Sequence, residues 1–325
     1  MTFKANHEKT DQHIEIPNHT IQDMVATVFT SNKISSCEVI SGGCANLNIK
    51  IKLVNELKPY ILRVYLRDKD AAFREQKIAA LIGETIPIPK VYFVGNCDGY
   101  RFAITEYKSG ITLRDLLLQS PEQAWKQVMV DAGKMFGAFH KYEFPTAGFF
   151  DSNLSIKPLP LDGQFLFTMD CLSNHKVNAT LGEKMVNRIR SLFLTQKKLL
   201  PDDSTPTLVH ADYGPENILV DKFDDEWKIT AILDWEFAYS DNWLIDVSNM
   251  LRYAHKMPQS FEEAFLLGIN NAGLELPSHW RSAINLLNLS SLLDLIVRYP
   301  LNERPKMQQD ILELIEYIVK QPGLQ

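Results

Sequence analysis

Residues 210–220 read HADYGPENILV, and residues 232–236 read ILDWE. In both stretches polar side chains stand beside a short apolar run, which predicts two strands, a loop before the first and a carboxylate at the end of the second. The polar side chains are His210, Asp212 and Asn217 in the loop and Asp234 after the second strand. The two stretches therefore predict a cluster of polar groups at the ends of neighbouring strands.

This cluster has the groups that phosphoryl transfer requires. The reaction needs a carboxylate that orients the attacking hydroxyl and accepts its proton, and it needs oxygen ligands that hold Mg²⁺ on the phosphate oxygens. Asp212 is the candidate catalytic base, and Asn217 and Asp234 are the candidate metal ligands.

The chain on either side of the cluster divides into two kinds of sequence. Residues 37–107 show period-two alternation, with three strand-like runs, a helix former at 71–84 and two further strand-like runs at 86–94 and 100–107. From residue 108 the chain is largely helical, with Thr112 as an N-cap and amphipathic helices expected at 121–142, 180–198, 277–298 and 305–320. We expect a polar arm at 1–20, a sheet-rich lobe at 21–107 and a larger helical lobe at 108–325.

The composition limits the classes of partner. The 325 residues are 45% hydrophobic, which is enough apolar material for two lobes. The net charge of −6 has the wrong sign for neutralising phosphates, so no nucleic-acid partner is expected. The acidic excess lies after residue 107, which favours a cationic ligand, although a solvated acidic surface explains it equally well.

Cysteine spacing and apolar runs indicate the cellular compartment in which the protein is expected. The four cysteines are scattered and the first residues lack the apolar stretch of a secretory signal, so we expect a cytoplasmic protein. The longest apolar region, near residue 290, is interrupted by Asn285, Asn288 and Asp294. It predicts an amphipathic helix, and no membrane partner is expected.

The pattern HxDxxxxN followed by D-x-E resembles the catalytic and metal loops of the aminoglycoside phosphotransferase and choline kinase branch of the protein-kinase-like superfamily. The resemblance implies an α+β, bilobal fold, with a small antiparallel-sheet N-lobe and a larger helical C-lobe. It extends over about residues 35–255. HAD stands where protein kinases have HRD, DWE stands for DFG, and no APE segment follows, so small-molecule substrates are expected rather than proteins.

The resemblance also implies roles for residues of the N-lobe. Arg63 and Glu75 match the basic residue of the third strand and the acidic residue of the following helix, and a guanidinium can bridge phosphate oxygens. The alternative is an ordinary strand-edge arginine and a surface glutamate. The segment ISGGCANLN matches the phosphate-covering loop, with donors from Ser41, Gly42, Gly43 and Asn46, although a plain hairpin turn would use the same glycines.

Other family positions complete the expected site. Backbone groups of the interlobe hinge would pair with the nucleotide base, and these belong to Glu106, Tyr107 and Lys108. In the family the histidine that matches His210 supports the loop, and the acid that matches Asp246 ties the loop to the next helix. Glu236 and Asp241 face metal or a cationic substrate, or alternatively are helix-start carboxylates that the helix dipole stabilises.

We therefore expect a kinase that uses ATP, or GTP, and Mg²⁺ to phosphorylate a hydroxyl of a small acceptor. The acidic C-lobe slightly favours a cationic acceptor such as an aminoglycoside, and the alternatives are a macrolide, choline, homoserine or another alcohol. A non-catalytic nucleotide-binding scaffold of the same fold and a metal-dependent phosphohydrolase remain competing hypotheses. Nucleotide preference, regiochemistry, biological role and oligomeric state are left open.

Overall fold

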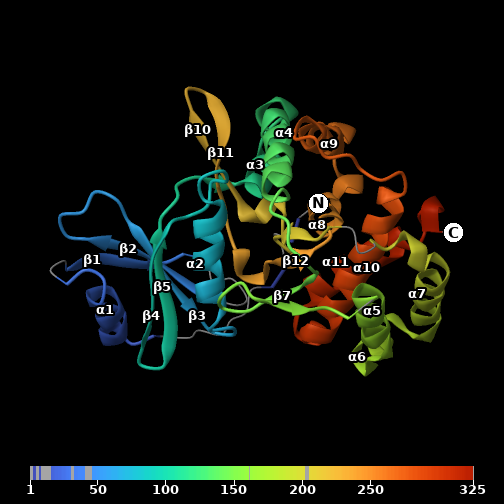
Figure 1. The fold of residues 1–325 in the computed structure, drawn as a ribbon, viewed down its shortest axis with the longest axis horizontal. Coiled ribbons are helices and arrows are strands. Elements are labelled where there is room, and N and C mark those ends of the chain that lie inside the picture. The colour runs from blue at the N-terminus through green and yellow to red at the C-terminus, as the bar shows by residue number, and fades with distance from the viewer. Residues whose placement is uncertain are drawn as a thin grey trace.

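The computed structural model describes residues 3–4, 7–8, 16–30, 33–40, 46–160, 162–201 and 205–324, and these form two lobes (Figure 1). The smaller lobe holds a five-stranded antiparallel sheet and two helices. Its elements are α1 (Asn18–Ala26), β1 (Ile34–Val39), β2 (Asn46–Leu53), β3 (Tyr60–Tyr65), α2 (Ala71–Ile82), β4 (Val91–Cys97) and β5 (Tyr100–Glu106), with sheet order β1-β2-β3-β5-β4. The predicted order of three strands, a helix and two strands is confirmed, whereas α1 is an addition.

The two faces of this sheet bury different side chains because the side chains of a strand alternate. On β3, Leu62 and Val64 point to the face where α1 packs with Met24. Tyr65 points to the opposite face, where it packs with Ala71 at the start of α2. The same alternation places Arg63 on the α2 side of a central strand, facing the interlobe region.

The larger lobe is mainly helical, as predicted. Its helices are α3 (Leu113–Gln119), α4 (Glu122–Phe139), α5 (Gly163–Ser173), α6 (His175–Leu181), α7 (Glu183–Gln196), α8 (Leu244–Leu251), α9 (Gln259–Asn271), α10 (Trp280–Arg298) and α11 (Pro305–Ile318). Thr112 Oγ1 accepts a hydrogen bond from Asp115 N at 3.1 Å, which makes it the N-cap of α3. Helices α4 and α9 cross in backbone contact, because a Cβ built on Gly133 would lie 2.2 Å from the Phe265 carbonyl oxygen.

Short strands of the larger lobe carry the loops of interest. They are β6 (Ile111–Thr112), β7 (Gly148–Phe150), β8 (Ile156–Pro158), β9 (Thr207–Val209), β10 (Ile218–Phe223), β11 (Glu226–Ile232) and β12 (Tyr239–Asp241). Two sheets result, β11-β10-β6 and β8-β7-β12-β9. The predicted strands on either side of the 210–217 loop and before Asp234 are β9, β10 and β11.

The first residues differ from the exposed arm that their polar composition predicts. Phe3 is 1% exposed and belongs to the core of the larger lobe. The Glu8 carboxylate accepts hydrogen bonds from Lys306 N and Met307 N, the free donors at the start of α11. The expectation is therefore wrong for these residues, because one aromatic side chain and one helix-capping carboxylate fix a segment that is otherwise polar.

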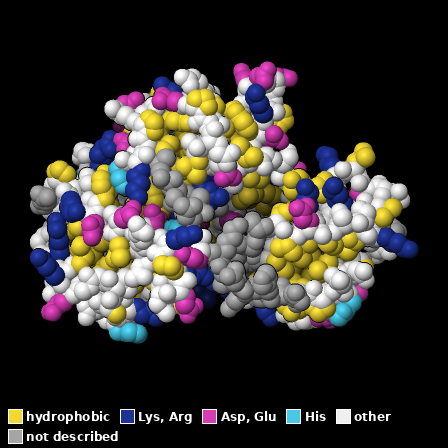
Figure 2. Space-filling model, turned by 180° about the vertical axis from the view of Figure 1, so that it is seen from behind, with side chains coloured by type: hydrophobic (Ala, Val, Ile, Leu, Met, Phe, Trp, Pro, Cys, Tyr) yellow, Lys and Arg dark blue, Asp and Glu magenta, His cyan; other side chains and the backbone are white. Residues whose placement is uncertain are grey.

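The surface shows no dominant charged region on the face seen in Figure 2, where basic and acidic side chains are interspersed. Within the described parts of the chain, no helix combines the length and the apolar character needed to cross a membrane.

Candidate active site

The loop between β9 and β10 is fixed by one buried carboxylate. Asp246 on α8 is fully buried, and its two oxygens accept hydrogen bonds from His210 N at 2.7 Å and Ala211 N at 2.9 Å. Ala211 has a left-handed backbone (φ 69°), a conformation that is costly outside glycine. Asp246 therefore holds the loop in a shape that it would not adopt unaided, which is the placement expected for an orienting acid.

His210 lies beneath the loop and not at its surface. The ring is buried, and its Nε2 lies 2.8 Å from the carbonyl oxygen of Leu233, the residue before Asp234. Leu233 N donates to Asn217 O at 2.8 Å. These two contacts tie the loop to the end of β11 and bring Asn217 and Asp234 to the same edge.

Asp212 and Asn217 lie in direct contact. Asn217 Nδ2 donates to Asp212 Oδ2 and to the Asp212 carbonyl oxygen, both at 2.9 Å. The amide thereby orients the carboxylate, whose side chain is 36% exposed.

Arg63 lies at the centre of three carboxylates. Its guanidinium is 2.5 Å from Asp234 Oδ1, 3.4 Å from Glu75 Oε1 and 3.5 Å from Glu236 Oε1. Although burial alone would lower it, Glu75 and Asp234 hold the pKa of Arg63 well above its ordinary value. Arg63 and Glu75 are each 9% exposed, which excludes the alternative of a strand-edge arginine and a surface glutamate.

Glu236 and Asn46 belong to the same cluster. Asn46 Nδ2 donates to Glu236 Oε2 at 2.8 Å, so here this amide contacts a carboxylate. Burial raises the pKa of Glu236 to about 7, with Glu75 and Asp234 adding to the effect and Arg63 opposing it. Ser41, Gly42 and Gly43 lie outside the described residues, and Asp241 lies in β12, opposite Thr207 of β9.

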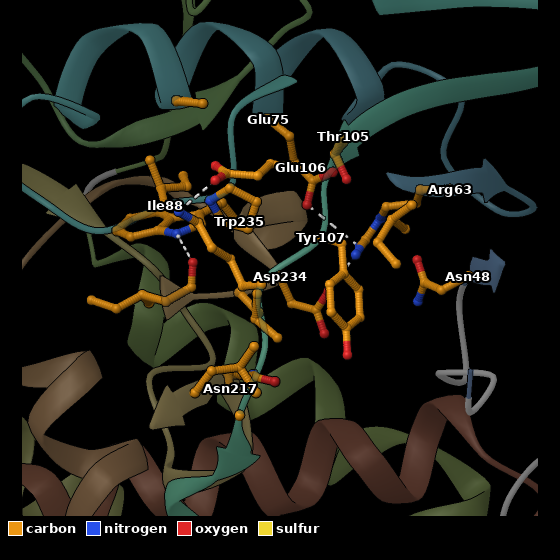
Figure 3. A pocket seen from close by; sticks show the side chains of 18 of the residues that line it. Asn48, Arg63, Glu75, Ile88, Thr105, Glu106, Tyr107, Asn217, Asp234 and Trp235 are labelled. Carbon is orange, nitrogen blue, oxygen red and sulfur yellow. Dashed lines mark hydrogen bonds and ion pairs between the residues drawn. The ribbon is translucent and has the colours of Figure 1, made fainter. Parts of the chain in front are cut away.

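A cavity of about 410 Å³ lies between the lobes, within the range of small-ligand sites. Apolar side chains line one part of it, and a polar part carries Arg63, Glu75, Asn217 and Asp234 (Figure 3). The apolar lining comes from both lobes and includes Ile40, Ile61, Ala79, Ile88, Val91, Leu219 and Ile232. A flat apolar ring at one end and an anionic group at the other would match this division.

The predicted hinge residues line the same cavity. Glu106, Tyr107 and Lys108 all contribute to its wall. Glu106 N donates to the Lys90 carbonyl oxygen at 2.8 Å, so this donor already serves the sheet edge. The Glu106 carboxylate pairs with Lys108 Nζ at 2.8 Å.

The donor set fits a magnesium ion. Mg²⁺ is usually held by one or two carboxylates together with waters and phosphate oxygens, and Asp234 and Asn217 supply two oxygen donors on the cavity wall. The described residues contain no group of three His, Cys, Asp or Glu side chains arranged for a metal. Arg63 Nε is buried and has no hydrogen-bond partner among the described residues, which leaves one donor for an anionic ligand.

Two residues at the loop, Lys4 and Glu216, were not predicted from the sequence. Lys4 Nζ is 3.1 Å from Asp212 Oδ1 and 2.5 Å from Glu216 Oε1. Glu216 lies inside the motif, next to Asn217, and its position there was the available signal. Nothing local to Lys4 predicts a contact with a residue more than 200 positions away.

Comparisons with known proteins identify the family and the fold. A model described as the phosphotransferase enzyme family matches residues 36–283. No curated protein matches. Among the solved structures, a thermostable aminoglycoside phosphotransferase APH(4)-Ia with ADP and hygromycin B is similar with a TM-score of 0.69 at 19% identity, covering 91% of this chain and 98% of that one.

Two further structures are similar over the same extent. A variant of aminoglycoside 2'-phosphotransferase-IIIa with GDP gives a TM-score of 0.70 at 16% identity, covering 93% of this chain and 97% of that one. The related complex with GDP and kanamycin gives 0.67 at 16% identity, covering 92% and 97%. These similarities confirm the predicted bilobal, protein-kinase-like fold.

Proposed function

Since this chain belongs to the phosphotransferase enzyme family, we propose that it is a kinase that uses Mg²⁺ and ATP, or GTP, to phosphorylate a hydroxyl group of a small, positively charged acceptor such as an aminoglycoside. The observation that carries the proposal is the convergence of Asn217, Asp234 and Arg63 on the wall of one cavity, with Asp212 in direct contact with Asn217. Solved relatives of the fold hold ADP or GDP together with hygromycin B or kanamycin, which supports a nucleotide and a cationic acceptor.

In this mechanism Asp212 accepts the proton of the acceptor hydroxyl, and Asn217 keeps the carboxylate oriented towards it. Asn217 and Asp234 would hold Mg²⁺, which neutralises charge on the phosphate oxygens when bound. Arg63 binds phosphate oxygens, and Glu75 keeps the guanidinium in place. Arg63 contacts Oδ1 of Asp234, and the other oxygen of this carboxylate would hold the metal.

The remaining residues bind or support. We propose that the backbone at Tyr107 and Lys108 pairs with the base, since Glu106 N serves the sheet, and that Ser41, Gly42 and Gly43 cover the phosphates. Asn46 donates one amide hydrogen to Glu236 and would offer the second to the phosphates. His210 and Asp246 support the loop, while Glu236 adds a third carboxylate to the cluster around Arg63. Asp241 has no supported role in this proposal.

We also propose a lobe boundary at residues 107/108 and a cytoplasmic location. β5 ends at Glu106, and the next elements, β6 and α3, belong to the larger lobe. The described cysteines, Cys37, Cys97 and Cys171, are free thiols, which supports a reducing compartment.

The test is ADP production from ATP, and separately GDP production from GTP, with and without Mg²⁺, across aminoglycosides, macrolides, choline, homoserine and simple sugars. Asp212→Ala is expected to lower acceptor-dependent turnover by about 10²- to 10⁴-fold. Asp225→Ala, at the exposed turn after β10, is the matched control. Undiminished turnover in Asp212→Ala would contradict the assignment of the base.

Two competing functions give different results in the same assay. A non-catalytic scaffold would bind nucleotide with no acceptor-dependent turnover. A phosphohydrolase would release inorganic phosphate from phosphoesters without any nucleotide.

A further inference from the structure

The side chain of Lys4 lies against the loop that carries the proposed base. Its ammonium contacts one oxygen of Asp212, while Asn217 contacts the other. Both oxygens of the proposed base are therefore engaged by the protein itself. An acceptor hydroxyl that approaches Asp212 Oδ1 must therefore compete with the Lys4 ammonium for that oxygen.

Glu216 provides the shorter of the two ion pairs, at 2.5 Å. Its side chain is only 15% exposed, and it folds back over the loop against Gly214, where an added Cβ would lie 2.6 Å from Glu216 Oε2. The loop thus presents two carboxylates to one cation. Burial alone would lower the pKa of Lys4, but Asp212 and Glu216 raise it above its ordinary value, so the amine stays protonated.

The segment that delivers Lys4 is anchored by side chains on a strained backbone. The ring of Phe3 packs on Tyr253 and Phe261, with ring centroids 5.4 and 5.9 Å apart. Phe3 and Lys4 both have positive φ angles, 38° and 62°, which non-glycine residues rarely adopt. Strain of this kind persists only while the contacts around it hold, so the segment is suited to release.

We propose that Glu216, beside Asp212, forms a binding site for a primary ammonium group, which Lys4 fills in the free protein and an amine of the acceptor fills during turnover, leaving Asp212 Oδ1 to the acceptor hydroxyl. Lys4 then competes with the acceptor and keeps the base blocked until the acceptor displaces it. The part played by the acceptor rests on the proposed function, whereas the occupancy by Lys4 does not.

Occupancy is tested by the reactivity of the Lys4 amine in the full-length protein. Trace acetic anhydride acetylates unprotonated amines, and mass spectrometry compares Lys4 with Lys126, whose side chain is 58% exposed. Lys4 is expected to react several-fold more slowly, because its ion pairs with Asp212 and Glu216 hold the amine in the protonated, unreactive form. Equal reactivity of the two lysines would overturn the proposal.

Variants show whether Glu216 is responsible. Glu216→Gln is expected to raise the Lys4-to-Lys126 ratio several-fold, while Glu226→Gln, exposed on β11, leaves it unchanged. Phe3→Ala releases the anchor without altering the loop and is expected to raise the same ratio, which covers the case in which Glu216→Gln does not fold. An unchanged ratio in every folded variant would refute the proposed site.

Displacement is tested with defined probes and without turnover. Kanamycin and spermidine both carry primary ammonium groups and are expected to raise the Lys4-to-Lys126 ratio, whereas the neutral sugar trehalose is not. The internal reference corrects for reagent consumed by the added amines. No change with either amine would overturn the acceptor half of the proposal. Displacement without phosphorylation of any acceptor would instead overturn the proposed function and leave the ammonium site standing.

Discussion

The two ends that we propose for the active site, one for the phosphates and one for the acceptor, both hold a cation with carboxylates but anchor it differently. At the phosphate end, Arg63 stands on the central strand β3 and contacts carboxylates from α2 and from the segment after β11. At the acceptor end, Lys4 stands on a short strained segment and contacts two carboxylates of one loop. The first cation is built into the framework, whereas the second rests on the loop and is replaceable.

This difference predicts how much each cation stabilises the fold. Removing one partner of a buried cluster leaves charges without compensation, whereas removing a partly exposed partner lets water take its place. Arg63 is 11% exposed in its side chain and Lys4 is 26% exposed. Removal of the Arg63 charge is therefore expected to lower the free energy of unfolding much more than removal of the Lys4 charge.

The largest effect is expected from Arg63→Met. This substitution leaves Glu75 and Glu236 buried without their cation and is expected to lower the free energy of unfolding by about 3–5 kcal/mol. Urea unfolding at pH 8 measures it, and the loss shrinks towards pH 5 because the carboxylates can then protonate. Lys52→Met, an exposed cation on the neighbouring strand β2, is the control. A loss below about 1 kcal/mol would mean that Arg63 contributes no more to the free energy of unfolding than a surface charge does.

A middle effect is expected from the titration of Glu236. Its pKa is about 7 in the folded protein, against an ordinary value of 4.5. The folded state therefore binds this proton more tightly than the unfolded state, so the group stabilises the fold at low pH and that contribution is lost as the pH rises from about 4.5 to 7. The contribution is up to about 3 kcal/mol.

Glu236→Gln isolates this contribution because it keeps the shape of the side chain and removes the titration. The difference in unfolding free energy between the wild type and the variant is expected to shift against the wild type as the pH rises from 4.5 to 7.5. Glu226→Gln, 75% exposed, should run parallel to the wild type throughout. Parallel curves for Glu236→Gln would show that folding does not raise the pKa of Glu236.

The sequence predicted the residues around Arg63, but it did not predict the contact of Lys4 with the loop. The period-two alternation of β3 and the helical pattern of 71–84 are local signals, and through the family resemblance they led to Arg63 and Glu75, which lie 3.4 Å apart. The loop motif likewise led to Asp212, Asn217 and Asp234. Strands and helices position these residues, and the periodic spacing of apolar side chains along such elements is visible in the sequence.

The missed features depend on single long-range contacts. Phe3 is one aromatic residue in a polar stretch, and only its pocket at Tyr253 and Phe261 shows that it is buried. The ion pair between Lys4 and Glu216 joins residues more than 200 positions apart, and no local sequence pattern indicates it. The helix α1 was missed because it spans nine residues and begins within the polar stretch that was expected to be an arm.

The smallest effect is expected from Lys4→Gln. Water can solvate Asp212 and Glu216 once the ammonium is gone, so the free energy of unfolding should change by no more than about 1 kcal/mol. Urea unfolding measures this beside Lys134→Gln, an exposed lysine that pairs with Asp131 at a similar distance of 3.0 Å. A loss as large as that of Arg63→Met would make Lys4 a framework residue and would remove the distinction between the two ends. A change no larger than that of Lys134→Gln, together with a reactive Lys4 in Phe3→Ala, would mean that the acceptor end is closed by a contact weak enough for a competing amine to open.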